Sequence, residues 1–305
     1  MEIQEFYSNG KLLLTGEYVV LDGAMALAIP TRYGQSLTVE PITKPSLIWE
    51  SYTQDGSLWF EIKMEIKHGE ITNFDYEDPI AERLLSILKA VKKQQPLLLP
   101  DQNGLRITTH LDFPRNWGLG TSSTLINNIA QWSGVDPFQL LADTFGGSGY
   151  DIACARHNVP ITYELSHNTG RTIIERNLNF LFEEHIYFVF LNKKQNSREG
   201  IATYKNNKAV SPSAISEITA ISNDMLSCGS LTAFQFLMES HESIISEVIK
   251  QKPVKEVLFK DFNGSIKSLG AWGGDFVMVA TDETPDAYFK SKGYDTIIPY
   301  RDLIL

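Results

Sequence analysis

Short β-type runs, separated by clusters of Gly, Pro, Asp or Asn, dominate the first half of the chain. They cover residues 11–15, 36–40, 46–51, 57–64 and 105–111. Runs of this length with turn residues between them are typical of strands joined by short connections. We therefore expect a twisted, antiparallel sheet in this half of the protein.

The clearest helical pattern follows Asp78, an N-cap residue that precedes a proline at the first helical position. Apolar residues then recur at helical spacing until Pro96. These residues are Leu84, Leu85, Leu88 and Val91. The pattern predicts an amphipathic helix.

Two more helices are expected after a glycine-rich segment. The first should start at residues 121–123 and end near Gly134. Its apolar face consists of Leu125, Ile126, Ile129 and Ala130. Asp136, followed by a proline, should cap the second helix.

The pattern changes after about residue 165, in the part of the chain where longer helical stretches begin. Strands are expected at 186–191 and 276–281, and helices at 212–226 and 230–250. We place a lobe boundary within 165–180 and predict an N-terminal lobe at 1–170 and a C-terminal lobe at 171–305. Polar residues dominate 193–211, which forms either a mobile loop over a site or a solvated connection.

Composition and charge narrow the class of protein. Of the 305 residues, 43% are apolar and 21% are charged, so the chain can bury a sizeable core. The formal net charge of -10 disfavours a broad electrostatic surface for nucleic acid or anionic lipid, since these partners favour clustered Lys and Arg. We expect neither a nucleic-acid partner nor a membrane.

Targeting signals and cysteines indicate a cytoplasmic protein. Residues 1–5 lack the basic start of a signal peptide, and no stretch approaches the roughly 20 apolar residues of a membrane span. Cys154 and Cys228 have no C-x-x-C spacing, and the six histidines have no metal-binding spacing. We interpret Cys154 as a packed small side chain and His241, in a helical run, as structural or exposed.

Residues 118–123, Gly-Leu-Gly-Thr-Ser-Ser, are the most informative segment for chemistry. Two glycines let the backbone approach a ligand closely, and the helix they open offers unpaired N–H groups and the positive end of its dipole. This combination suits a polyphosphate. The hydroxyls can add hydrogen bonds or one Mg²⁺ ligand.

The same segment also fits a glycine turn followed by ordinary Ser/Thr capping. It contains no Walker loop, G-x-x-x-x-G-K-S/T. A full G-x-G-x-x-G is also missing, because Ser123 occupies the last glycine position. The P-loop and Rossmann interpretations are weakened accordingly.

Residues 8–23 read Ser-Asn-Gly-Lys-Leu-Leu-Leu-Thr-Gly-Glu-Tyr-Val-Val-Leu-Asp-Gly. This segment resembles the first motif of the GHMP kinases, P-G-K-x-x-L-x-G-E-H/Y-x-V-x-x-G. The superfamily includes galactokinase, homoserine kinase, mevalonate kinase and phosphomevalonate kinase. Asn9 replaces the usual proline. The matching residues are Lys11, Gly16, Glu17, Tyr18, Val20 and Gly23.

The glycine loop resembles the second motif of this superfamily, P-x-x-x-G-L-G-S-S-A. Residues 267–276, Lys-Ser-Leu-Gly-Ala-Trp-Gly-Gly-Asp-Phe, resemble the third, with Trp272 where the family normally has glycine. The three motifs span nearly the whole chain in the expected order. By this resemblance the ATP-binding residues are Gly118, Leu119, Gly120, Thr121, Ser122 and Ser123.

Residues 146–153, Gly-Gly-Ser-Gly-Tyr-Asp-Ile-Ala, are similar to the G-S-G-x-D-I/V-A stretch of phosphomevalonate kinases. Taken alone, an aspartate after such a turn is more often a helix N-cap than a catalyst. In register with the other motifs, the resemblance implies that Asp151 accepts the proton of, or a hydrogen bond from, the attacking oxygen. Lys11 would keep Asp151 ionised and favour charge on the transferred phosphoryl group.

The resemblance also implies a metal ligand. Ser122 aligns with the second serine of the motif and is the expected Mg²⁺ ligand. Mevalonate kinases have a glutamate ligand ahead of their catalytic aspartate, at a position that is Leu140 here. Asp143 either substitutes for it or is a plain helix-face carboxylate.

Glu17 and Tyr18 resemble the phosphomevalonate kinase variant of the first motif, which favours a phosphorylated acceptor. Lys193, Lys194 and Arg198 either bind its phosphate or form a solvated basic loop. The expected acceptor-binding residues are Glu17, Tyr18, Ser148, Gly149, Arg198, Gly273 and Gly274.

The resemblance implies a two-lobed α+β fold with an S5-like N-terminal lobe and a ferredoxin-like C-terminal lobe. It implies ATP and Mg²⁺ as cofactors and 5-phosphomevalonate as the acceptor, with mevalonate kinase or sugar kinase as alternatives. A GHMP-fold protein that binds nucleotide or metabolite without phosphorylating it is the rival, supported by Asn9, Trp272 and the missing glutamate. Lys11 and Asp151 argue against that rival. The oligomeric state, a homodimer included, stays open.

Overall fold

The computed structural model describes residues 2–72, 77–99, 103–166, 170–195, 197–206 and 211–305, without the side chains of 197 and 198. Contacts group the chain into two units, each assembled from separate segments. Unit 1 contains Met1–Gly10, Tyr33–Arg115 and Leu119–Arg156, and unit 2 contains Lys11–Arg32, Asn116–Gly118 and His157–Leu305. The predicted lobes at 1–170 and 171–305 stay a prediction.

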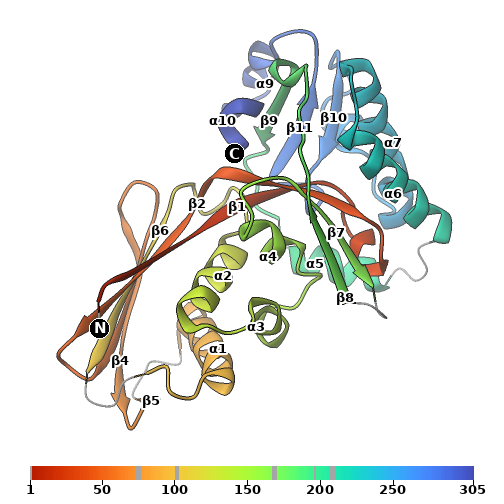
Figure 1. Cartoon of the computed structure of the whole chain (residues 1–305). Coiled ribbons are helices and arrows are strands. Elements are labelled where there is room, and N and C mark those ends of the chain that lie inside the picture. The colour runs from red at the N-terminus through yellow and green to blue at the C-terminus, as the bar shows by residue number, and fades with distance from the viewer. Residues whose placement is uncertain (1, 73–76, 100–102, 167–169, 196, 207–210) are drawn as a thin grey trace. The chain divides into compact units, whose positions relative to one another are not determined.

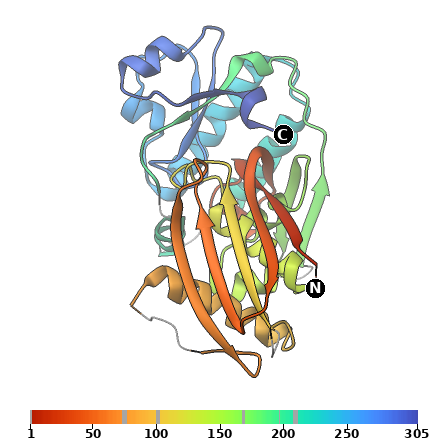
Figure 2. The same cartoon turned by 90° about the vertical axis from the view of Figure 1, so that its left-hand side faces the viewer.

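Unit 1 is a sheet with helices on one face (Figures 1 and 2). Strands β1 (Gln4–Thr15) and β2 (Ala26–Ile42) belong partly to each unit, and β3 (Ser46–Tyr52), β4 (Leu58–Lys67), β5 (Glu70–Thr72) and β6 (Gly104–Leu111) belong to unit 1. The strand order is β5-β4-β3-β6-β2. The helices are α1 (Pro79–Gln94), α2 (Thr121–Ser133), α3 (Pro137–Thr144) and α4 (Tyr150–Ala155).

The expectation of a wholly antiparallel sheet is wrong for one pair, because β3 and β6 run parallel. Parallel neighbours need a crossover connection, and the chain between these strands supplies one that contains α1. The other pairs that β3, β4 and β6 make, with β4, β5 and β2, are antiparallel as predicted.

The core of unit 1 lies between the sheet and its helices. On β3, Leu47 and Trp49 are buried while Ile48 between them is partly exposed, which is the period-two pattern of a strand with one covered face. The predicted apolar stripe of α1 packs into the same cluster. Asp78 caps this helix by accepting the N–H of Ile80 at 2.8 Å, as predicted.

Unit 2 contains a second, antiparallel sheet with the order β10-β11-β9-β12. Its strands are β9 (Ile186–Phe190), β10 (Ser265–Ser268), β11 (Phe276–Ala280) and β12 (Ile297–Pro299). Strands β7 (Ile161–Ser166) and β8 (Gly170–Glu175) form a hairpin that pairs through β7 with the start of β2. The helices are α5 (Ser197–Asn206), α6 (Pro212–Leu226), α7 (Leu231–Ile249), α8 (Val254–Leu258), α9 (Asp286–Ser291) and α10 (Tyr300–Leu303).

Both faces of this second sheet are covered, which explains why β11 is apolar at every position. Val277 and Val279 pack in one cluster with Phe259 and Phe289, at the side of α8 and α9. Alternate residues such as Met278 face the other side, where α7 packs against β10 and β11 (Figure 1). All five side chains of β11 are buried.

The predicted helices at 212–226 and 230–250 are confirmed as α6 and α7. The expected loop at 193–211 is wrong in part, because α5 lies within it. Among the described side chains of this polar helix only Tyr204 is buried, and its hydroxyl donates to Asp22. One buried side chain among those described leaves too weak a pattern to be seen in the sequence. Within the described ranges, no helix is long and apolar enough to cross a membrane.

Candidate active site

The glycine loop ends at Gly120, the N-cap residue of α2, which has a φ of 96°. This left-handed conformation favours glycine. No side chain makes a capping hydrogen bond at this end of α2 in the part of the chain that the structure describes. The first-turn N–H groups are therefore oriented to receive an anion. Ser122 is exposed on this turn, whereas Ser123 is buried and donates to the Gly120 carbonyl at 2.8 Å.

A buried polar network inside unit 1 fixes α2. The Asn128 side chain donates to the Gln35 carbonyl at 2.7 Å, and Thr124 Oγ1 donates to Gln35 Oε1 at 2.7 Å. Ser8 donates to Asn128 Oδ1 at 2.6 Å. All four side chains are at most 2% exposed, so the network resists rotation of the helix and of the loop before it. The sequence analysis missed it, because isolated amides and hydroxyls form no pattern.

Asp151 lies in the first turn of α4, which packs against α2 within unit 1. Gly149, with a φ of 91°, is the N-cap residue of α4, so the interpretation of Asp151 as an N-cap is wrong. Its Oδ1 accepts the N–H of Ile152 at 3.0 Å. Asp151 is partly exposed and Ser148 is buried. The catalytic and acceptor-binding roles of this turn stay predictions.

In unit 2, Lys11 Nζ donates to the carbonyl of Gly118 at 3.2 Å. Gly118 has a φ of 70°, and a Cβ atom at this position would lie 2.4 Å from Cγ of Asp275. A lysine, the start of the glycine loop and a carboxylate therefore meet in this unit. The pairing of Lys11 with Asp151 stays a prediction, since these residues belong to different units.

The sequence analysis did not single out Asp275, although it directly follows the two glycines of the third motif. Asp275 is 9% exposed and has a φ of 52°, which is unusual for a residue other than glycine. The Gln195 N–H donates to its Oδ1 at 3.1 Å. Burial raises the pKa of Asp275, while this N–H and the charges of Lys11 and Lys194 oppose the rise.

The third motif closes tightly on the segment after β9. A Cβ at Gly273 would lie 2.7 Å from Gln195 Nε2, and one at Gly274 would lie 2.5 Å from the Lys193 carbonyl. These glycines permit a close approach of two backbone segments. Their predicted role in acceptor binding stays untested.

Trp272, which replaces a family glycine, is accommodated inside unit 2 at 5% exposure. Its backbone N–H donates to Tyr18 Oη at 3.2 Å, and its backbone carbonyl accepts from Gln195 Nε2 at 2.7 Å. Tyr18 itself has a φ of 64° and packs against the ring of Tyr204, 5.6 Å away between centroids. The first and third motifs are thus joined through the side chain of Tyr18.

Glu17 lies in a buried charged cluster. Lys267 Nζ donates to Glu17 Oε1 at 2.5 Å, and His241 Nε2 lies 3.1 Å from Oε2. These three side chains are fully buried. Burial alone would raise the pKa of Glu17, but the charge of Lys267 opposes this effect, and that pKa is lowered overall. The buried carboxylate therefore stabilises the first motif within unit 2. Its contact with an acceptor stays a prediction.

His241 and Glu242 complete this cluster, which confirms His241 as structural. His241 Nε2 accepts the Gly16 N–H at 3.0 Å, and burial, together with Lys267, lowers the pKa of His241 to about 4. Glu242 Oε1 accepts the Ser268 N–H at 2.9 Å, and burial raises the pKa of Glu242 to about 8.

Stability should fall between pH 6.5 and 8 because of Glu242. Its pKa in the folded protein, about 8, exceeds the ordinary value of 4.5, so the folded state binds this proton more tightly than the unfolded state does. This stabilises the fold at low pH, and the stabilisation decreases as the pH rises to 8. The lowered pKa of His241 acts in the opposite direction only below its ordinary value of 6.5. Urea unfolding should therefore show a loss on the order of 1–2 kcal/mol across this window. Glu242→Gln should flatten it, and the exposed control Glu247→Gln should not; identical pH profiles for both variants would contradict the assignment.

Four further residues considered in the sequence analysis, and the expected metal site, are described here. Asp143 is exposed and accepts Gln139 Nε2 at 2.8 Å, so the interpretation as a helix-face carboxylate is confirmed. Cys154 is packed in the core, as predicted. Lys193 is exposed, and the Arg198 side chain lies outside the described residues. Among the described residues no group of three or more His, Cys, Asp or Glu could hold a metal ion, so Ser122 as a metal ligand stays a prediction.

The chain has the fold of the GHMP kinases, which confirms the α+β fold class predicted from its motifs. It is similar to the mevalonate kinase of Methanococcus jannaschii, with a TM-score of 0.70, 15% identity and 97% coverage of both chains. Streptococcus pneumoniae phosphomevalonate kinase in complex with phosphomevalonate and AMPPNP gives a TM-score of 0.68 and 14% identity, with 99% of this chain and 98% of that chain covered. Lactococcus lactis galactokinase complexed with galactose gives 0.65 and 14%, with 98% and 94% covered. No family model and no curated protein matches the sequence.

Proposed function

We propose that this protein is an ATP-dependent small-molecule kinase of the GHMP type. The observation that carries the proposal is the α2 N-terminus, which follows a left-handed glycine and receives no side-chain cap from the described residues. The buried network under α2 holds this N-terminus in place, and the N–H groups there suit the phosphates of ATP. The similarity in fold to kinases that act on mevalonate, phosphomevalonate and galactose supports the same class.

Phosphoryl transfer passes through a loose, anionic transition state, so the protein mainly positions the reactants and neutralises charge. We assign charge neutralisation to Lys11, whose Nζ donates to the carbonyl of Gly118 at the start of the loop. Asp151 accepts a hydrogen bond from, or takes the proton of, the attacking oxygen, which is a phosphate oxygen in 5-phosphomevalonate and a hydroxyl in the alternative acceptors. An exposed hydroxyl on Ser122 beside an anion-receptive helix end fits a Mg²⁺ ion held largely by phosphate oxygens, and the ion would reduce the charge of the transferred group.

The acceptor we propose is 5-phosphomevalonate, on the resemblance of Glu17-Tyr18 and of residues 146–153 to phosphomevalonate kinases. Mevalonate and sugars are the alternatives, because structures of both kinds of kinase share this fold. Release of ADP, measured by a coupled assay with 5-phosphomevalonate, mevalonate, galactose and homoserine, tests the proposal. Nucleotide binding without ADP release for any acceptor would favour the non-catalytic rival.

Mg-ATP should raise the unfolding temperature of the wild-type protein, and Gly120→Val should remove this stabilisation. A β-branched side chain is strained at a φ of 96° and blocks the backbone from the phosphates. Gly134→Val is the matched control, because Gly134 ends the same helix with a φ of 70°. It should lower the unfolding temperature yet keep the shift with Mg-ATP. Equal shifts in wild type and Gly120→Val would refute the loop assignment.

We expect kcat/KM for 5-phosphomevalonate to exceed that for mevalonate at least about tenfold, a margin of about 1.4 kcal/mol that one charge-assisted contact supplies. If Arg198 makes this contact, Arg198→Ala should erase most of the preference while leaving mevalonate turnover nearly unchanged. Lys205→Ala, an exposed change on the same helix, serves as the control. Preference for mevalonate in the wild type would reassign the acceptor.

A further inference from the structure

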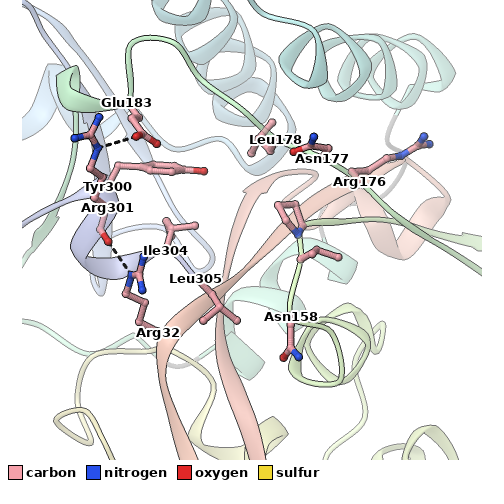
Figure 3. Close-up of a pocket in the computed structure, with 12 residues that line it drawn as sticks. Arg32, Asn158, Arg176, Asn177, Leu178, Glu183, Tyr300, Arg301, Ile304 and Leu305 are labelled. Atoms are coloured by element: carbon pink, nitrogen blue, oxygen red, sulfur yellow. Dashed lines mark hydrogen bonds and ion pairs between the residues drawn. The ribbon is translucent and has the colours of Figure 1, made fainter.

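A pocket of about 490 Å³ lies in unit 2, within the range of small-molecule sites (Figure 3). One wall is formed by α10 and the two residues that follow it, and the other by segments 158–160 and 176–178. Arg32 and Glu183 complete the lining. None of the residues assigned above to nucleotide or acceptor lines this pocket.

Hydrogen bonds hold the walls in place. Arg32 Nε donates to the Arg301 carbonyl at 2.8 Å, and Arg301 Nε donates to Glu183 Oε1 at 2.7 Å (Figure 3). On the opposite wall, Arg176 Nε donates to Thr162 Oγ1 at 3.0 Å. The pocket is thus formed before any ligand binds, which reduces the entropic cost of binding.

The charge of the lining is positive although the whole chain carries a net charge of -10. Three arginines line the pocket, Arg32, Arg176 and Arg301, against one acidic side chain, Glu183. In the side-chain contacts described, each arginine uses its Nε atom. The terminal Nη groups of these guanidinium groups can then donate to an oxyanion of a ligand. A bound oxyanion is stabilised by charge-assisted hydrogen bonds of this kind.

Tyr300 supplies an observation independent of charge. Its side chain extends from α10 into the pocket (Figure 3), and the residue is only 6% exposed. The ring packs against Phe180 and Phe188, while the hydroxyl has no hydrogen-bond partner among the described residues. A hydroxyl that faces the pocket without a described protein partner can pair with a ligand in place of water. Burial, and then Glu183, raises the pKa of Tyr300, so the phenol stays protonated and can donate.

We propose that this pocket binds a small organic dianion that combines an oxyanion, such as a phosphate monoester, with an apolar body. The Tyr300 hydroxyl donates to the oxyanion, and the arginines of the lining supply positive charge around it. Leu178 and Ile304, which also line the pocket, contact the apolar body. The proposal does not depend on the kinase assignment, because its residues are separate.

Phenyl phosphate is a suitable probe, with inorganic phosphate, benzoate and phenol as comparisons, in calorimetric titrations without nucleotide. We expect phenyl phosphate to bind at least about tenfold more tightly than each of the other three, since only it has both charges and the ring. Tyr300→Phe should weaken it at least about tenfold, as should Arg32→Gln or Arg176→Gln, because each removes a hydrogen bond to a charged group. Tyr300→Phe should unfold at no lower temperature than wild type, because it removes a hydroxyl that bonds nothing described in the protein.

Two controls locate the binding. Arg171→Gln, an exposed arginine on β8 outside the lining, should leave the Kd of phenyl phosphate within about twofold, as should Lys11→Met. Loss of binding in Lys11→Met would place the probe at the proposed kinase site and overturn the proposal. Undiminished binding in Tyr300→Phe and in both arginine variants would overturn it as well, as would the absence of binding by all four probes. Equal affinity for benzoate would overturn the preference for a dianion.

Discussion

Replacing Asp151 with asparagine is expected to lower kcat at least about 100-fold, the lower range for loss of a general base, with little change in ATP affinity. Asparagine keeps an oxygen that can accept the Ile152 N–H, so the turn at the start of α4 should persist. What is lost is the ability to take a proton. Steady-state kinetics with the best acceptor, together with an ATP-binding isotherm, measure both quantities.

A matched change and a double mutant sharpen this test. Asp143→Asn alters an exposed carboxylate on neighbouring α3 and should leave kcat within about twofold of wild type. Lys11→Met should also lower kcat, and the double mutant Lys11→Met/Asp151→Asn should be less than additive if both residues act on one step. Near-normal turnover of Asp151→Asn would remove this residue from the chemistry.

Lys267→Met should produce the largest loss of stability among the changes considered. The substitution leaves the carboxylate of Glu17 buried without its cation, which typically costs about 3–5 kcal/mol of unfolding free energy. Restoring neutrality with Glu17→Gln/Lys267→Met should recover a large part of this loss, because no charge then remains unpaired at that position. Urea unfolding at one pH measures all three proteins.

An exposed ion pair provides the contrast. Lys290 Nζ lies 3.2 Å from Asp286 on α9, and both side chains are about half exposed. Lys290→Met should change the unfolding free energy by less than about 1 kcal/mol, because solvent screens this pair. If Lys267→Met behaves like Lys290→Met, the cluster around Glu17 does not stabilise the first motif.

Local signals in the sequence predicted α1, α2, α3, α6 and α7, but not α4, α5, α8, α9 and α10. Asp78 and Asp136, each before a proline, mark the starts of α1 and α3, and the structure shows both as N-caps. Strand β2 was predicted only at 36–40 but runs over Ala26–Ile42, because Pro30 and the alanines before it do not read as a strand. The β7–β8 hairpin was missed altogether.

In the candidate site, too, the local motifs could be predicted from the sequence, whereas contacts between distant residues could not. The glycine motifs are contiguous, and the positive φ of Gly118, Gly120 and Gly149 shows why those positions favour glycine. The partners of these motifs are distant in sequence: Lys267 and Glu17 are 250 positions apart, and nothing near either residue points to the other. Asp275 could have been noticed beside its glycines, but its proximity to Gly118 depends on the fold.

The interleaving of the two units has a consequence for synthesis on the ribosome. Every residue of unit 1 has been made once Arg156 is added, whereas most of unit 2 follows later. Translation adds roughly 5–20 residues per second, so unit 1 can complete its core while its neighbours are still being made. Residues 11–32 belong to unit 2, and Leu13 and Ile29 in this segment are buried in the finished fold. The nascent chain therefore carries an apolar segment that awaits its partners for seconds, and we expect chaperones to bind it during this interval.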